Sequence, residues 1–84
     1  MNERNFNEIA DKISALLNGI KGMFSDYYSV GDRDYVGESG EIEVWVYPYN
    51  GEDYKSYISV CDDGIYVDFL GENYKTFDEF AKDL

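Results

Sequence analysis

The sequence predicts an α+β fold with an N-terminal amphipathic helix, an antiparallel meander of three to four strands and a short C-terminal helix. Three observations predict it. Apolar residues recur at helical spacing near the N-terminus, they alternate with polar residues in the middle of the chain, and a helix-capping sequence stands near the C-terminus. With 84 residues, 44% of them hydrophobic, the chain is expected to form a single domain over residues 1–84.

The N-terminal segment carries the apolar stripe of an amphipathic helix. Asn5 and Glu8 resemble a capping pair, and Gly22 is a plausible C-terminal cap, so we predict a helix over residues 5–22. We expect its apolar face to cover a sheet. The residues of the stripe are Phe6, Ile9, Ala10, Ile13, Leu16, Leu17, Ile20 and Met23.

Residues 24–40 show the least regular pattern, with a strand expected over residues 24–30 and a polar loop over residues 31–40. Val36 occupies a ligand position of a calcium-loop template in this region, and Glu43 falls in a predicted strand, so the pattern argues against a calcium site. The residues that do match the template are Asp32, Asp34, Gly37 and Glu43.

Residues 41–49 form the clearest strand, because two unlike rows of side chains alternate along it. Ile42, Val44 and Val46 make an aliphatic row that suits a packed core. The other row mixes acids with amphipathic aromatic residues, which suits a contact surface. Its members are Glu41, Glu43, Trp45, Tyr47 and Tyr49.

The turn after this strand decides which row is buried. A two-residue turn would place the aromatic row beside Ile58 and Val60 of the next strand, expected over residues 54–61. A three-residue connection with a bulge at Gly51 would place the aliphatic row there instead. We expect the bulge, because it unites the aliphatic residues, and a slip of one residue would exchange the two faces.

A fourth strand is expected over residues 65–70, after a two-residue turn at Asp63 and Gly64. This register places Val67 opposite Val60 on the inner face and leaves an outer face of polar and aromatic residues. The outer residues are Tyr57, Ser59, Cys61, Tyr66 and Asp68.

Residues 71–74 are read as a turn that leads into the final helix. Thr76 and Glu79 form a capping box at its start. The apolar side of this helix consists of Phe77, Phe80, Ala81 and Leu84.

The negative charge is concentrated in the middle of the chain. Residues 26–72 hold twelve acids and two bases, a net charge of −10 out of −11 for the whole chain. Carboxylates at this density repel one another and weaken the fold, which favours a binding role for them. Solubility is the alternative explanation, because Asp and Glu residues are effective at that task.

The sequence lacks the residues that most enzymes use. It contains no His, its one cysteine, Cys61, has no histidine partner, and no phosphate loop or nucleophile elbow is present. We therefore expect no catalytic residues, no metal, no cofactor and no enzymatic activity. An acidic segment without a basic stripe also argues against direct binding of nucleic acid.

The apolar runs are too short for a membrane span or a signal peptide. We therefore expect no membrane partner and a cytoplasmic location, in agreement with the single cysteine. The sequence leaves the oligomeric state open between a monomer and a homodimer.

The remaining hypothesis is binding to a basic partner. Alternate residues of a strand lie about 6.8 Å apart on one face, close to the rise of two nucleotide steps, so Glu41 and Glu43 are spaced to imitate phosphates. Aromatic neighbours would supply the anchors of an interface. The candidate contact residues are Glu41, Glu43, Trp45, Tyr47, Tyr57, Asp62, Asp63, Tyr66 and Asp68.

In size, charge and order of elements the chain resembles the small acidic phage-encoded inhibitors that imitate DNA, and in particular anti-CRISPR proteins. The resemblance spans the whole chain but includes no sequence motif, so it assigns no role to any residue. It implies an inhibitor of a basic nucleic-acid-binding protein, such as a nuclease or a CRISPR effector, acting in the host-cell cytoplasm if phage-encoded. An immunity protein for a nuclease toxin and a generic acidic interaction module fit the same features.

Overall fold

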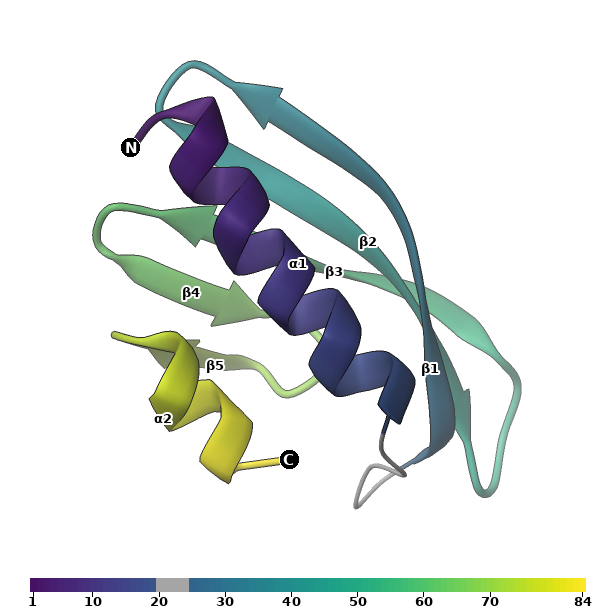
Figure 1. Ribbon diagram of the computed structural model, residues 1–84. Helices are drawn as coiled ribbons and strands as arrows, with labels where there is room; N and C mark the ends of the chain where they lie inside the picture. Colours follow the sequence, from purple (N-terminus) through teal and green to yellow (C-terminus); the bar gives the residue numbers. More distant parts are fainter. Residues whose placement is uncertain (20–24) are drawn as a thin grey trace.

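The structure is a computed structural model that describes residues 1–19 and 25–84. A five-stranded antiparallel sheet, in the order β1-β2-β3-β4-β5, forms one layer, and two helices form the other (Figure 1). The α+β meander is therefore confirmed, with five strands where three to four were expected. The additional strand covers residues 72–74, so the prediction of a turn over residues 71–74 is wrong there. The elements are α1 (Glu3–Gly19), β1 (Ser25–Val36), β2 (Ser39–Pro48), β3 (Tyr54–Cys61), β4 (Gly64–Val67), β5 (Glu72–Tyr74) and α2 (Phe77–Lys82).

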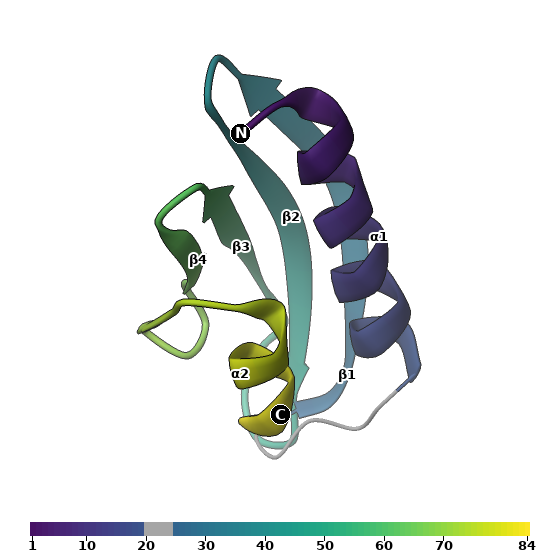
Figure 2. The ribbon, with the colours of Figure 1, turned by 60° about the vertical axis from the view of Figure 1, so that its left-hand side comes forward.

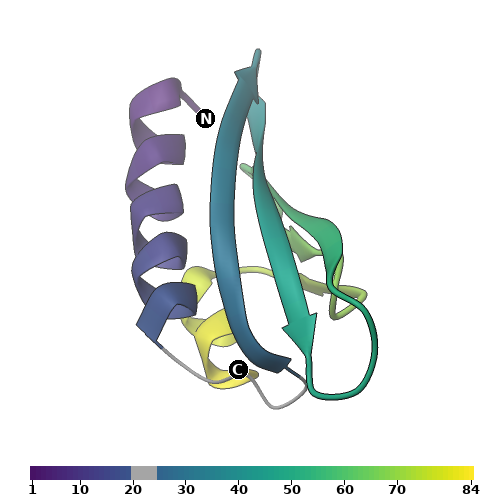
Figure 3. The same cartoon turned by 90° about the vertical axis from the view of Figure 1, so that its right-hand side faces the viewer.

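Both helices lie on the same side of the sheet, as Figures 2 and 3 show from two further directions. We call the helix-covered side the inner face and the other side the open face. No helix in the described part of the chain is long and apolar enough to cross a membrane. The buried core lies between the helices and the inner face. It contains Phe6, Ala10, Ile13, Leu17, Tyr28, Ile42, Val44, Val46, Ile58, Val60, Ile65, Val67, Tyr74 and Phe80.

The first helix starts earlier than predicted. The Asn2 side-chain oxygen accepts a hydrogen bond from the backbone N–H of Asn5 at 2.8 Å, so Asn2 caps the helix and the prediction of Asn5 as the cap is wrong. Phe6 on the predicted stripe is fully buried, as expected. The predicted cap at Gly22 lies outside the described residues.

The first strand runs through the region that the sequence assigns to a loop, and this prediction is wrong. β1 continues to Val36 and returns into β2 by a tight turn at Gly37, whose φ is +68°. The reason is a bulge between Val30 and Arg33, where the pairing with β2 shifts. Because a bulge adds one residue, it interrupts the alternation by which a strand is recognised in the sequence.

The pairing of β2 with β3 follows the register of the predicted three-residue connection. Ile42 pairs with Ile58 and Val46 with Tyr54, so the aliphatic row faces the core as expected. The connection itself is longer than predicted, because the pairing of β2 with β3 ends at Val46 and Tyr54, and residues 49–53 form the loop.

The pairing of β3 with β4 differs from the predicted register by two residues. Val60 pairs with Ile65, and Cys61 pairs with Gly64, which therefore belongs to the strand rather than to the turn. The inner and outer faces are unchanged, because a shift of two preserves the alternation. Gly64 has a φ of +143°, and a Cβ there would overlap the backbone oxygen of Tyr74.

The capping box of the final helix is confirmed. The Thr76 hydroxyl accepts a hydrogen bond from the backbone N–H of Glu79 at 3.2 Å. The Glu79 carboxylate in turn accepts from the backbone N–H of Lys75 at 3.1 Å. The Tyr74 hydroxyl donates to Asp83 at 2.9 Å, and burial together with this bond raises the pKa of Tyr74 to about 12.

The assignment of faces predicts opposite sensitivities for two adjacent residues of β2. Val44 is fully buried, whereas Trp45 is 38% exposed on the open face. Val44→Ala should lower the free energy of unfolding by about 1–3 kcal/mol, and Trp45→Ala should lower it less. Denaturant unfolding of both variants checks this, and a larger loss for Trp45→Ala would show that the faces are assigned the wrong way round.

Candidate functional site

The open face carries a row of polar side chains that crosses all five strands. Asp34 pairs with Glu41, Glu41 with Ser59, Ser59 with Tyr66, and Tyr66 with Asn73. The row is acidic on β1 and β2 and neutral on the other strands. The pairing of the strands therefore gathers charge on one half of the face.

The bulge in β1 adds to this acidic half. It leaves Gly31 and Asp32 together opposite Glu43, so Asp32 joins Asp34 and Glu41 beside the hollow described below. Asp34 and Glu41 face each other directly, an arrangement that destabilises a strand pair. Within residues 1–19 and 25–84, none of the exposed carboxylates of Asp32, Asp34 and Glu41 forms an ion pair.

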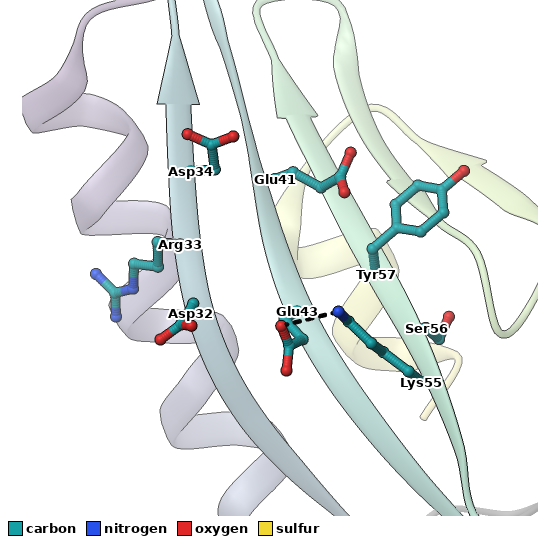
Figure 4. A pocket seen from close by; sticks show the side chains of 8 residues that line it. All are labelled: Asp32, Arg33, Asp34, Glu41, Glu43, Lys55, Ser56 and Tyr57. Carbon is teal, nitrogen blue, oxygen red and sulfur yellow. Dashed lines mark ion pairs between the residues drawn. The ribbon is translucent and has the colours of Figure 1, made fainter.

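A shallow hollow of about 300 Å³ lies between these acids and β3 (Figure 4). Of the two basic residues that line it, Arg33 turns towards α1, where its guanidinium lies 2.7 Å from the Asp11 carboxylate. Lys55 is then the basic group that faces the acids. The lining consists of Asp32, Arg33, Asp34, Glu41, Glu43, Lys55, Ser56 and Tyr57.

Two neighbouring side chains contact the carboxylate of Glu43. One carboxylate oxygen accepts from the indole N–H of Trp45 at 3.1 Å, and the other lies 3.3 Å from the ammonium of Lys55. The missing side chain of Gly31 makes room for it, since a Cβ there would lie 2.9 Å from Oε1 of Glu43. Glu43 therefore connects β2 with β3, packs close to Gly31 of β1 and orients Trp45.

Tyr57 and Tyr66 form an aromatic pair next to the acidic half, with ring centroids 6.0 Å apart. Partial burial, followed by the nearby charges of Asp68 and Glu41, raises the pKa of the Tyr57 hydroxyl. The phenol therefore stays neutral near physiological pH. A neutral phenol ring with carboxylates beside it is a favourable contact for a cation.

The remaining predicted contact residues lie apart from the hollow or take part in internal contacts. Asp62 and Asp63 occupy the turn between β3 and β4, and Asp62 lies 2.6 Å from the N-terminal ammonium. Asp68 accepts a hydrogen bond from the buried Ser56 at 2.9 Å. Tyr47 is half-buried on the open face, two positions beyond Trp45. Of the predicted set, the structure thus brings Glu41, Glu43 and Tyr57 together at the hollow. Trp45 bonds to Glu43, and Tyr66 packs against Tyr57.

Asp32, Asp34 and Lys55 belong to this surface, although the sequence pattern did not predict them as contact residues. The two aspartates were assigned to a loop, although their spacing of two residues is the same as that of Glu41 and Glu43. That spacing is the signal that could have placed them on one face of a strand.

Comparison with known proteins adds no relative. No protein-family model, no curated protein and no solved structure matches the chain. Among the residues that the structure describes, no group of three or more His, Cys, Asp or Glu side chains could hold a metal ion. Function is therefore inferred from the chemistry of the open face.

Proposed function

We propose that this protein is a non-enzymatic inhibitor that binds a basic nucleic-acid-binding protein and blocks the surface that holds the nucleic acid. The observation that carries the proposal is the direct pairing of Asp34 with Glu41, beside Asp32, on the face of the sheet opposite α1 and α2. Facing carboxylates cost stability. A positively charged partner would relieve this repulsion, because the same carboxylates attract its basic side chains.

The spacing of the acids supports imitation of nucleic acid. Glu41 and Glu43 lie on the same face of β2, about 6.8 Å apart along the strand, close to the rise of two nucleotide steps. Asp34 sits on the adjacent strand, about 4.8 Å away in the pairing direction. A groove that binds phosphates would meet a comparable density of negative charge.

Aromatic residues beside the acids support a protein partner. Trp45 is 38% exposed, and Tyr57 lines the hollow. Such rings are typical anchors of protein interfaces, while surrounding charges speed the encounter. We propose a nuclease or a CRISPR effector as the partner, met in the cytoplasm.

The test is displacement of fluorescent DNA from a panel of purified CRISPR effectors and nucleases. The variant Asp32→Asn/Asp34→Asn/Glu41→Gln should associate with a partner at least about tenfold more slowly than the wild type, because it lacks the steering charges. Association of the wild type should also slow as salt rises from about 50 to 500 mM, which shortens the screening length from roughly 14 to 4 Å.

The matched control is Glu52→Gln/Asp53→Asn/Glu72→Gln, which removes the same charge from exposed positions outside the hollow. It should retain most of the association rate. If both triple variants lose the association rate equally, net charge alone explains the steering, and the acids of the hollow have no special role. A wild-type protein that displaces DNA from no member of the panel would support the solubility explanation instead.

A further inference from the structure

The hollow on the open face already contains a cationic group of the protein's own. Lys55 on β3 stands directly opposite Trp45, yet its side chain runs diagonally towards Glu43 (Figure 4). Its ammonium lies 3.3 Å from the Glu43 carboxylate. A long side chain can reach a diagonal neighbour across an antiparallel pair, and here it does so in the direction of the negative charge.

This internal ion pair is of the kind that breaks easily. The Lys55 side chain is 59% exposed, whereas that of Glu43 is 25% exposed. An exposed pair gains little from Coulomb attraction and loses side-chain entropy by holding one geometry. Lys55 can therefore leave for solvent without disturbing the sheet, while Glu43 keeps its hydrogen bond from Trp45.

We propose that Lys55 is a built-in placeholder for a basic side chain of the partner, and that binding displaces it from the hollow. This inference rests on the proposed function of the open face and states how that face is occupied before binding. A cation that replaces Lys55 would contact Glu43, with Asp34 and Glu41 nearby and the Tyr57 ring along the wall.

Arginine fits this position better than lysine. Its planar guanidinium can pair with a carboxylate through two parallel hydrogen bonds and stack on a tyrosine ring at the same time. Lys55 also limits which cations bind. A cation that contacts the hollow more weakly than Lys55 does would not displace it. This competition would favour an arginine-bearing partner over stray cations.

The test uses a short oligoarginine peptide without tryptophan as the probe. Trp45 is the only tryptophan of the chain and bonds to Glu43, so its fluorescence reports binding in the hollow. Lys55→Met should bind the peptide about two- to fivefold more tightly than the wild type, because the peptide no longer competes with an exposed ion pair. The gain should disappear when Glu43→Gln is also present.

Lys82→Met is the matched control, because it changes the net charge equally at an exposed position on α2. If Lys55→Met increases the affinity for the peptide more than Lys82→Met does, the result supports the role of Lys55 as a placeholder. Equal gains, weaker binding by Lys55→Met, or no peptide binding by either protein would overturn it. Lys55→Gln, checked for folding by circular dichroism, repeats the comparison with a polar replacement.

The peptide titration is independent of the displacement of DNA. If Lys55→Met shows the expected gain but no nucleic-acid-binding protein is inhibited, the proposed function fails and the placeholder remains. If DNA is displaced but Lys55→Met shows no gain beyond its control, the placeholder alone fails.

Discussion

Gly64→Ala should lower the free energy of unfolding by about 3–5 kcal/mol, enough to unfold a large fraction of a domain of this size. Gly64 has a φ of +143°, which residues with a side chain rarely adopt. The added methyl group would also overlap the backbone oxygen of Tyr74 and lie 3.5 Å from the Cα of Lys75. The distance to Lys75 is an ordinary van der Waals contact, whereas the overlap with the Tyr74 oxygen cannot be relieved by a change of rotamer, because that oxygen belongs to the backbone. Urea unfolding followed by circular dichroism measures the loss.

Gly71→Ala is the comparison at a glycine with a milder backbone conformation and no neighbour for the added methyl group. Gly71 also has a positive φ, of +65°, but a Cβ there meets nothing within 4 Å. This variant should lose about 1–2 kcal/mol, the cost of the left-handed conformation alone. Equal losses at the two glycines would show that β4 and the end of β5 do not approach as closely as described.

Phe80→Ala should cost about 3–5 kcal/mol, because it removes the largest buried side chain of α2. The Phe80 ring is fully buried, 5.6 Å from the centroid of Tyr74 and 6.3 Å from that of Phe77. A helix as short as α2 has little stability of its own, so this ring holds it against the sheet. Calorimetry or denaturant unfolding measures the effect.

Phe77→Ala provides the comparison on the same helix. Phe77 is only partly buried against the core, so its truncation should cost clearly less than that of Phe80. If both variants lose the same stability, Phe80 is not the main anchor of α2. Neither residue lies on the open face, so oligoarginine binding should be retained by any variant that still folds.

The acidic hollow depends on the register of three strands at once. Asp34 comes from β1, Glu41 and Glu43 from β2, and Lys55 from β3. A shift of one residue in either pairing would turn the open-face side chains of the shifted strand towards the core. Variants that loosen the sheet are therefore expected to weaken the surface even when they leave its residues unchanged.

The sequence by itself determined the features that depend on local patterns. The alternation along residues 41–49 identified Val44 as buried and Trp45 as exposed, because a strand places successive side chains on opposite faces. It also indicated that the aliphatic row of residues 41–49 shares one face with Ile58 and Val60, which the pairing of Ile42 with Ile58 confirms. The helix cap at Thr76 could also be predicted from the sequence, because Glu79, which completes the capping box, lies only three residues away.

Only the tertiary structure decided which acids meet and what they contact. The bulge in β1 shifts the alternation, so Asp32 and Asp34 were assigned to a loop instead of to the open face. Glu43 is predicted to contact a partner, and the tertiary structure adds that Trp45 on β2 and Lys55 on β3 contact its carboxylate in the free protein. Strand pairing joins residues distant in the sequence, and whether a carboxylate stands free or is neutralised depends on the side chains that this pairing places opposite it.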